Sequence, residues 1–233
     1  MFNGKMKAVT FSFDDGVTQD IRLIEIFNKY GIKCTFNLNS ELLGKDGELT
    51  YEGKKCTHNK VKPHEVASIY KDHEVAVHTL THPNLTQIAD EKEIIRQVEK
   101  DRLNLSELCG YEVHAMAYPC GGVNNDDRVA KIIKENTGVK FSRTITSNYS
   151  FEKQENLYRF NPTVYSFREF DKMNELADEF LAMKPDSPKI FYIWAHAYEF
   201  DWFDTWNEFE TFCQKISGKD DIFYGTNSQV LLK

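Results

Sequence analysis

The chain has 233 residues, of which 41% are hydrophobic and 28% are charged, and its formal net charge is −7 at pH 7. These fractions lie near the averages of soluble globular proteins, so they indicate neither a disordered chain nor a membrane protein. Because proteins that bind nucleic-acid backbones need clustered positive charge, the acidic balance and the scattered lysines predict no nucleic-acid partner.

Alternating strand and helix patterns run along the chain. Residues 7–13 are β-branched and aromatic, and residues 18–30 then place apolar side chains at helical spacing before a glycine. Asp90 followed by Glu93 predicts a capping box at the start of a later, long helix. The patterns predict further strands at residues 33–38, 74–78, 113–118, 139–145 and 189–194, and helices at 63–71, 90–109, 126–136 and 167–183.

Repeated strand-then-helix units predict an α/β fold with a mostly parallel sheet. The number of units favours a TIM-like barrel, or a barrel that lacks a strand, as a single domain over residues 1–233. A Rossmann-like open sheet is the competing fold. The Gly-rich phosphate loop typical of that fold is absent after the first predicted strand.

Residues 44–61 (GKDGELTYEGKKCTHNKV) contain three glycines and show no periodicity. We therefore expect an irregular surface excursion rather than a domain linker. Four histidines have no evident partner and are expected to be surface or packing residues: His58, His64, His73 and His114.

Two features of the sequence concern the compartment. Residues 1–7 contain no apolar run of about 7 to 15 residues, as a secretory signal has, and no stretch approaches the roughly 18 apolar residues of a spanning helix. The odd number of cysteines and the lack of C-x-x-C spacing fit neither a disulfide framework nor a cysteine zinc site. We expect a cytoplasmic protein without membrane contact, unless a leader has been trimmed, and five reduced thiols: Cys34, Cys56, Cys109, Cys120 and Cys213.

Polar residues follow four of the predicted strands directly. They are Asp14-Asp15-Gly16, His78-Thr79-Leu80-Thr81-His82, Tyr118-Pro119-Cys120-Gly121-Gly122, and His196. In βα barrels the carboxyl ends of the strands form the functional face, so these residues are expected to converge on one rim.

The residue types at this rim suit a metal. Histidines four apart lie on one face if the turn between them is helical, and neutral imidazoles bind zinc or similar ions at about 2.0 to 2.1 Å. Two adjacent aspartates repel one another unless a cation lies between them. Two histidines and one aspartate would leave coordination positions open for water, as in catalytic sites, and the other aspartate could accept a proton from that water. The alternative is that the aspartates are turn residues and His82-Pro83 is an ordinary loop.

Four segments resemble the ordered motifs of the polysaccharide deacetylases, carbohydrate esterase family four. They are TFSFDDG at residues 10–16, HTLTH at 78–82, YPCGG at 118–122 and YIWAH at 192–196. The resemblance implies a distorted seven-stranded βα barrel that hydrolyses an acetamide, usually on N-acetylated sugars and sometimes an O-acetyl ester.

The resemblance also implies roles for individual residues. Asp14 corresponds to the general base, and Asp15, His78 and His82 correspond to the ligands of one divalent ion, with zinc as the first expectation. His196 corresponds to the general acid. The backbone N–H of Cys120, beside Tyr118 and Pro119, corresponds to the oxyanion hole.

The chain departs from the family pattern at several positions. The third motif usually reads Arg-x-Pro-Tyr, but this chain has Ala117 for the arginine and Cys120 for the tyrosine. The fourth motif is not recognisable, and Arg143 is the candidate for the missing guanidinium. Trp194 replaces the usual leucine of the fifth motif, so the pocket for the acyl methyl group is expected to be reshaped.

Other candidates lie near His196. Glu199 and Asp201 are candidates to orient it or to bind a sugar hydroxyl, with a solvated loop as the alternative. The three tryptophans, Trp194, Trp202 and Trp206, are candidates for stacking on sugars or for core packing. Asn37 and Asn39 alternate on the second predicted strand and are candidates for the barrel mouth.

From these residues and from what the resemblance implies, we predict a metal-dependent hydrolase that removes acetyl groups from an N-acetylated or O-acetylated carbohydrate, with metal-bound water as nucleophile. One alternative is an amidohydrolase with the same barrel and metal that acts on a small cyclic amide or imide. Another is a catalytically silent carbohydrate-binding protein. The sequence predicts no oligomeric state.

Overall fold

The computed structural model describes residues 2–232 of the chain. Its main sheet is entirely parallel and has the strand order β7-β6-β5-β2-β1-β9-β8. The strands are β1 (Lys7–Asp14), β2 (Cys34–Leu38), β5 (Glu74–Val77), β6 (Ala115–Ala117), β7 (Phe141–Arg143), β8 (Val164–Tyr165), β9 (Lys189–His196) and β10 (Ile222–Tyr224). Strand β9 pairs along the full length of one edge of β1. The other edge of β1 pairs with two strands, its first half with β10 and its second half with β2.

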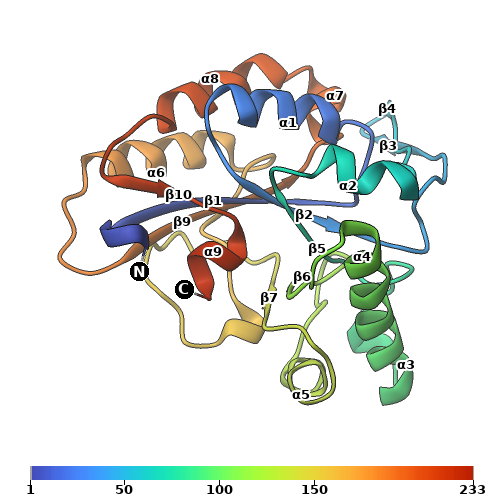
Figure 1. Cartoon of the computed structure of the whole chain (residues 1–233). Helices are drawn as coiled ribbons and strands as arrows, with labels where there is room; N and C mark the ends of the chain where they lie inside the picture. Colours follow the sequence, from blue (N-terminus) through green and yellow to red (C-terminus); the bar gives the residue numbers. More distant parts are fainter. Residues whose placement is uncertain (1, 233) are drawn as a thin grey trace.

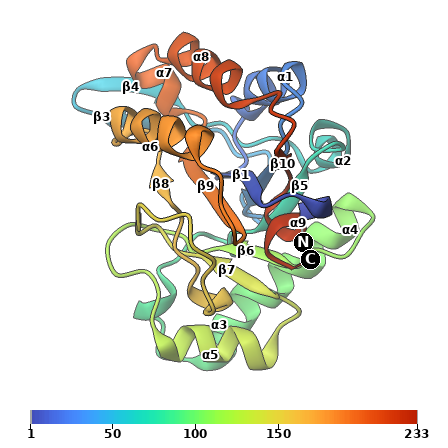
Figure 2. The same cartoon turned by 90° about the vertical axis from the view of Figure 1, so that its left-hand side faces the viewer.

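Helices cover the sheet from opposite sides (Figures 1 and 2), with α1, α6, α7 and α8 on one side and α3 and α5 on the other. The α-helices are α1 (Asp20–Lys29), α2 (Val66–Ile69), α3 (Glu91–Ile95), α4 (Asp101–Cys109), α5 (Asp127–Asn136), α6 (Phe170–Ala182), α7 (Glu199–Phe203), α8 (Trp206–Ile216) and α9 (Asn227–Leu231). Short 3-10 turns lie at η1 (Phe2–Gly4), η2 (Pro63–Glu65), η3 (Leu85–Gln87) and η5 (Leu157–Arg159).

One extended segment, residues 160–165, joins the two ends of the sheet. At its start, the Phe160 N–H donates to Ser142 O at 3.0 Å and the Thr144 N–H donates to Phe160 O at 2.9 Å, which ties the segment to β7. At its end, β8 pairs with β9. The sheet therefore curls round, so that β7 at one end of the strand order is linked to β8 at the other end, and helices surround it. The predicted distorted seven-stranded βα barrel is confirmed.

Aromatic side chains hold the first strand against the helices. All eight residues of β1 are buried, as is typical of a parallel strand covered on both faces. The Phe11 and Phe27 ring centroids lie 4.9 Å apart, and those of Phe13 and Phe209 lie 5.9 Å apart. Removing such a ring typically costs about 3 to 5 kcal/mol of stability, so Phe13 is a main anchor of the strand end that carries the two aspartates.

The helix predicted over residues 90–109 forms as α3, a π-helical turn η4 (Arg96–Lys100) and α4, ending at Gly110 in the left-handed region. Asp90 caps it by accepting from the Lys92 N–H at 3.0 Å. The predicted capping box itself is wrong, because the Asp90 side chain accepts from Lys92 rather than from the Glu93 N–H, and the Glu93 carboxylate binds the Arg96 guanidinium instead of the Asp90 N–H.

Most of residues 44–61 lie at the surface as expected, but the prediction that this segment is irregular is wrong. The segment contains an antiparallel hairpin of β3 (Glu48–Tyr51) and β4 (Lys54–Thr57). Its two-residue turn, Glu52-Gly53, has positive φ at both positions, but glutamate is not among the residues that normally indicate such a turn. The segment is tied to the barrel by the Thr18 N–H, which donates to Asn59 O at 2.8 Å.

Within residues 2–232, the structure contains no helix with the length and apolar character needed to cross a membrane. The five cysteines are free thiols in this fold.

Candidate active site

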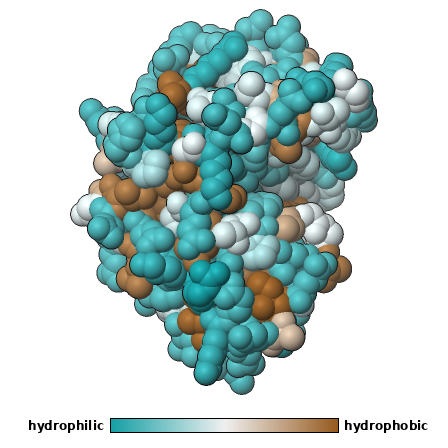
Figure 3. Space-filling view, turned by 90° about the vertical axis from the view of Figure 1, so that its right-hand side faces the viewer, coloured by the Kyte–Doolittle hydropathy of each residue, from teal (hydrophilic) through white to brown (hydrophobic). Residues whose placement is uncertain are grey.

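The candidate site lies where the central strands of the barrel end. Asp14 is the last residue of β1, and it is in register with Asn37 of β2 and with His196 of β9. Figure 3 views the molecule from the side toward which β1 runs, and hydrophilic residues cover most of that face around a smaller hydrophobic group. The structure therefore brings the predicted strand-end residues together on one rim.

Asp15, His78 and His82 form a compact group of possible metal ligands. One ligand atom from each lies within 4.8 Å of the others. The Asp15 Oδ1 atom lies 3.6 Å from His82 Nε2 and 4.0 Å from His78 Nε2. A divalent ion about 2.0 to 2.2 Å from each atom would draw the three atoms slightly inward, so the donor set fits such an ion.

The two histidines meet without the helical turn that their spacing suggested. The HTLTH segment has no helical structure, and Thr79 and His82 both lie in the left-handed region, with φ of 70° and 60°. The Thr79 hydroxyl accepts a hydrogen bond from the His82 N–H at 3.1 Å, which stabilises this tight loop. Asp15 also has a positive φ of 85°, and such sparsely populated conformations are typical of functional sites.

Both imidazoles are suited to bind as neutral ligands. His78 Nδ1 lies 2.9 Å from Ala117 O, which leaves Nε2 directed at the ligand group. Burial lowers the pKa of His78 to about 4, and burial likewise lowers the pKa of His82. The His78 main chain is fixed from behind by the Asp101 carboxylate, which accepts from the His78 N–H at 3.1 Å.

Asp14 is held by two side chains, Arg143 and Asn37. Arg143 Nη2 lies 2.5 Å from both carboxylate oxygens, and the Asn37 amide donates to Oδ1 at 2.8 Å. Burial raises the pKa of Asp14, but the positive charges of Arg143, His78 and His196, together with the Arg143 hydrogen bond, outweigh this effect, so the pKa of Asp14 lies below its ordinary value. The Arg143 guanidinium carbon lies 4.5 Å from the Trp194 ring centroid, so Trp194 supports the arginine from within the barrel.

His196 faces a carboxylate that favours its charged form. His196 Nδ1 lies 2.9 Å from Glu199 Oε1, and the Tyr165 hydroxyl donates to the same oxygen. Burial alone would lower the pKa of His196, but the charge and hydrogen bond of Glu199 raise it to about 9. The group is therefore an imidazolium at neutral pH and can donate a proton.

Two residues that the sequence did not predict as part of the site, His58 and Lys60, lie against Asp15. His58 Nε2 lies 3.1 Å from Asp15 Oδ2, and Lys60 Nζ lies 2.7 Å from Asp15 O and 3.4 Å from Oδ1. We expected His58 to be a surface or packing residue without a partner, but its imidazole contacts the Asp15 carboxylate. Both side chains come from the 44–61 segment, which brings two basic groups against Asp15, one of the possible ligands.

The loop after β6 presents the backbone N–H of Cys120. Cys120 has a φ of 69°, and its Sγ lies 3.4 Å from His82 O. A single buried amide, Asn124 Nδ2, donates to the carbonyls of Tyr118, Pro119 and Cys120 at 3.2, 3.0 and 2.8 Å. Within residues 2–232 the Cys120 N–H has no hydrogen-bond acceptor, so it is free to bind a substrate oxygen.

Other predicted candidates lie elsewhere. The Asp201 carboxylate accepts from Gln19 Nε2 at 2.9 Å and from Trp206 Nε1 at 2.7 Å, so it braces the start of α8 and does not orient His196. The Tyr118 side chain points into the core, where its hydroxyl donates to Tyr158 O at 2.8 Å. Asn39 holds the HTLTH loop by donating to Thr79 O at 2.9 Å.

Comparison with known proteins places this geometry in context. The sequence model of a family described as polysaccharide deacetylase matches residues 3–141 of the chain. No curated protein matches the sequence. Among solved structures, the peptidoglycan deacetylase PdaC from Bacillus subtilis has a TM-score of 0.56 at 17% identity, covering 97% of this chain and 90% of that chain.

Two further solved structures are similar to this chain. The Streptococcus pyogenes deacetylase PplD has a TM-score of 0.52 at 19% identity, covering 64% of this chain and 61% of that chain. BA3943 from Bacillus anthracis, described as a CE4 family pseudoenzyme, has a TM-score of 0.54 at 18% identity, covering 97% of this chain and 66% of that chain. The chain thus spans less than two thirds of the length of these two proteins, and the likeness shows a shared fold.

Proposed function

The chain belongs to the polysaccharide deacetylase family, and from that premise we propose that it is a metal-dependent hydrolase that removes acetyl groups from an N-acetylated or O-acetylated carbohydrate. We further propose that residues 1–233 form one catalytic domain, with zinc as the first candidate for the bound ion.

One observation carries this proposal. A group of three possible ligands, Asp15, His78 and His82, lies at the same strand ends as a carboxylate held ionised, Asp14, and an imidazole held protonated, His196. A carbohydrate-binding protein without activity has no need of a base, an acid and an incomplete ligand set together.

Asp14 is suited to the role of general base. A divalent ion held by the three ligands would lower the pKa of water and polarise the acetyl carbonyl. Asp14 is ionised at neutral pH because Arg143 stabilises its charge, so it can accept the proton of the attacking water. Asn37 keeps the carboxylate turned toward the rim through its hydrogen bond of 2.8 Å.

The remaining steps fall to Cys120 and His196. The Cys120 N–H would donate to the carbonyl oxygen as negative charge develops on it, and Asn124 fixes that N–H by holding the three surrounding carbonyls. His196 would then protonate the departing amine nitrogen, or the alcohol oxygen of an ester. Acetate and the deacetylated sugar are the products.

Acetate release tests the proposal. The purified protein would be stripped of metal, supplied with Zn²⁺, and incubated with N-acetylglucosamine oligomers, peptidoglycan and O-acetylated xylan. We expect metal-dependent acetate release from at least one of them, and Asp14→Asn is expected to lower it about 10² to 10⁴-fold. Cleavage of hydantoin or succinimide instead would favour the cyclic-amide alternative. Sugar binding without acetate release from metal-loaded protein would favour the silent binding protein.

A further inference from the structure

The long helix beside the HTLTH loop contains one irregular turn. Helices α3 and α4 follow one another in Figure 1, and the π-helical turn η4 joins them. Such turns are rare, occur mostly as single turns within α-helices, and are frequent at functional sites. Gln97 on η4 and Asp101 directly after it are polar residues with exposures of only 3% and 0%. Because burying polar side chains is unfavourable unless they are hydrogen bonded, their partners indicate what the turn does.

At this turn a main-chain carbonyl of the helix binds the HTLTH loop. Each carbonyl of an α-helix accepts from the N–H four residues later, so Gln97 O would ordinarily accept from the Asp101 N–H. The Asp101 N–H donates to Val98 O instead. Gln97 O accepts from the Leu80 N–H at 3.0 Å, and Leu80 is the middle residue of HTLTH. The irregular turn thus bonds directly to the main chain between the two histidines.

The Gln97 side chain binds the next residue of the loop. Its Oε1 atom accepts from the Thr81 N–H at 3.2 Å, and its Nε2 atom donates to the Thr81 hydroxyl at 3.0 Å. The same nitrogen donates to Glu93 Oε1 at 3.0 Å, one turn earlier in the helix. Both ends of the amide are therefore engaged, and its orientation is fixed.

The Asp101 carboxylate joins two strand ends. Its Oδ1 atom accepts from the Ser40 N–H at 2.7 Å, and its Oδ2 atom accepts from the His78 N–H at 3.1 Å. The His78 N–H is shared with Leu38 O at 2.9 Å. Ser40 follows Asn39, whose amide donates to the HTLTH main chain. One buried carboxylate therefore ties the loop after β2 to the first residue of the HTLTH loop.

The HTLTH loop needs such support because its main chain is strained. Thr79 and His82 have φ of 70° and 60°, which residues other than glycine rarely adopt. Such conformations persist only where the surrounding structure determines them. Functional side chains must be held within about 0.5 Å of their productive positions, so a small change in this main chain would move an imidazole away from an ion.

We propose that η4 is a positioning element of the candidate metal site, in which Gln97 and Asp101 hold the HTLTH loop so that His78 and His82 meet one divalent ion. This inference rests on the proposed function for the presence of that ion. Neither Gln97 nor Asp101 belongs to the group of possible ligands, and both act through the main chain of the loop.

The Zn²⁺ affinity of folded variants, measured by competition with a chelator, tests the inference. Losing a partner that orients a metal ligand typically lowers metal affinity about 10- to 100-fold. Asp101→Ala and Gln97→Leu should therefore each bind Zn²⁺ at least about 10-fold more weakly, and Asp101→Asn, which keeps one acceptor, should lose less. The absorption spectrum of bound Co²⁺ should change as well, because it reports the geometry of the ligands. Unchanged affinity in both Asp101→Ala and Gln97→Leu would overturn the inference.

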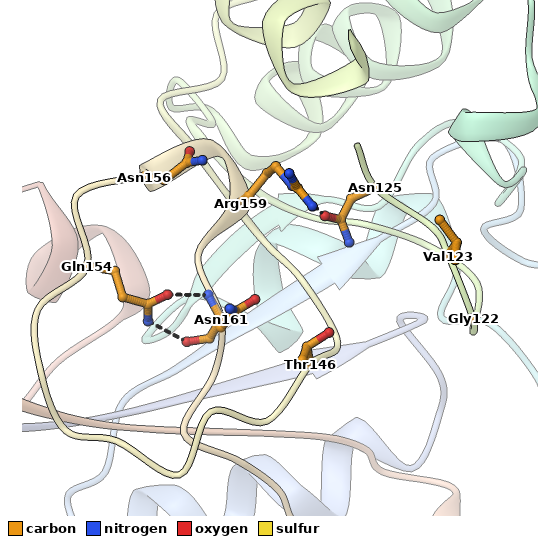
Figure 4. A pocket seen from close by; sticks show the side chains of 8 residues that line it. All are labelled: Gly122, Val123, Asn125, Thr146, Gln154, Asn156, Arg159 and Asn161. Atoms are coloured by element: carbon orange, nitrogen blue, oxygen red, sulfur yellow. Dashed lines mark hydrogen bonds between the residues drawn. The ribbon is translucent and has the colours of Figure 1, made fainter. Parts of the chain in front are cut away.

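Two controls separate positioning from general loosening of the fold. Gln154 makes two hydrogen bonds to the Asn161 main chain, at 2.7 and 2.9 Å, beside a polar pocket of about 570 Å³ (Figure 4). Gln154→Leu therefore removes a similarly bonded glutamine from a different loop. Glu99→Gln changes η4 itself, where the carboxylate pairs with Arg102 at 2.6 Å rather than with the HTLTH loop. Both controls should keep the wild-type Zn²⁺ affinity, and an equal loss in Glu99→Gln would contradict the inference.

Deletion of Lys100 tests the irregular turn directly. Lys100 is exposed and is the last residue of η4, so removing it shortens the π turn toward an ordinary α-helical turn without taking a side chain from the core. We expect helical content to be retained and Zn²⁺ affinity to fall about 10-fold or more. A folded deletion variant with wild-type affinity would overturn the role of the turn. If the deletion variant does not fold, Asp101→Ala and Gln97→Leu decide.

Acetate release separates this inference from the proposed function. A wild-type protein that binds Zn²⁺ but releases no acetate, with weaker Zn²⁺ binding in the Gln97 and Asp101 variants, would support the inference and refute the deacetylase. Metal-dependent acetate release, with Zn²⁺ affinity that does not depend on Gln97 or Asp101, would support the deacetylase and overturn the inference.

Discussion

The Arg143 guanidinium forms a buried ion pair with the Asp14 carboxylate, in which Arg143 Nη2 lies 2.5 Å from each carboxylate oxygen and both side chains are almost fully buried. The two residues come from β7 and β1, which are separated in the sheet by three other strands. An arginine at this position supplies a charge that Ala117, the counterpart of the family's usual arginine, lacks.

Arg143→Met should therefore depress turnover at neutral pH and move the acidic limb of the pH-rate profile upward. The pKa of Asp14 now lies below its ordinary value because of Arg143, and without that charge the buried carboxyl would hold its proton to higher pH. Arg143→Lys should recover only part of the loss, because lysine cannot donate from a planar fork. Arg96→Met, which breaks an exposed pair with Glu93, is the control. A profile of Arg143→Met that overlays the wild type at unchanged metal content would assign the tuning of Asp14 to another residue.

Glu199→Gln should shift the alkaline limb of the rate profile downward. The carboxylate of Glu199 raises the pKa of His196 from 6.5 to about 9, so the acid form of His196 is present below about pH 9 and is lost above it. The stability that this pair contributes is likewise fully present below pH 6.5 and is lost as the pH rises through about 9. Removing the charge should bring the alkaline limb below pH 7, measured by the rate profile and by NMR titration of His196.

Glu112→Gln is the matched control, because Glu112 lies 3.5 Å from the His114 imidazole on the surface. An NMR titration in which Glu199→Gln leaves the His196 midpoint near 9 would show that other charges set its protonation.

The rim of the barrel could be predicted from the sequence because parallel strands end at a common edge. Once Asp14, His78 and His196 are assigned to strand ends, their convergence follows from topology. Glu199 was a candidate because it follows His196 by only three residues, so its carboxylate was expected to lie near the imidazole. Asn124 was not predicted, because an asparagine two residues after Gly122 marks a turn but does not indicate which carbonyls its amide binds.

His58 and Lys60 could not be predicted in the same way. They are 43 and 45 residues from Asp15, in a segment without periodicity that forms a short, largely exposed hairpin. Their approach to Asp15 depends on how that segment folds back onto the loop after β1. Local sequence patterns contain no information about such a tertiary contact.

The wild-type protein should bind about one divalent ion per chain, and His78→Ala should bind less. Only one three-ligand group is found within residues 2–232. Because binding to the folded state stabilises it by about 2.7 kcal/mol at 100 times the dissociation constant, Zn²⁺ should raise the Tm of the wild type but not that of His78→Ala. His114→Ala, which changes a partly exposed histidine away from the group, should behave as the wild type does. Elemental analysis that finds full metal in His78→Ala would refute the ligand assignment.

Lys60→Met should tighten the binding of Zn²⁺. The Lys60 ammonium lies 3.4 Å from Asp15 Oδ1, the oxygen that faces the two histidines, and both side chains are at most 7% exposed. A divalent ion bound to Asp15 Oδ1 would therefore lie close to the positive charge of Lys60. Unit charges about 4 Å apart interact by about 4 kcal/mol at an effective dielectric constant of about 20, so this repulsion opposes metal binding even after partial compensation. Methionine keeps the length of the side chain and removes the charge, and we expect at least about 10-fold higher affinity by competition with a chelator.

His58→Phe should act in the opposite direction. His58 Nε2 lies 3.1 Å from Asp15 Oδ2, the oxygen that faces away from the histidine ligands, and so it orients the carboxylate without competing for the ion. Losing such a partner typically costs about 10- to 100-fold in metal affinity. His58→Gln keeps a donor and should lose less, and Lys62→Met, an exposed lysine two residues beyond Lys60, should leave the affinity unchanged. If Lys60→Met raises the Zn²⁺ affinity and His58→Phe lowers it, general destabilisation of the hairpin cannot be the cause, because it would lower the affinity in both variants. Weaker metal binding in Lys60→Met would show instead that the lysine serves mainly to anchor the Asp15 main chain through its 2.7 Å hydrogen bond.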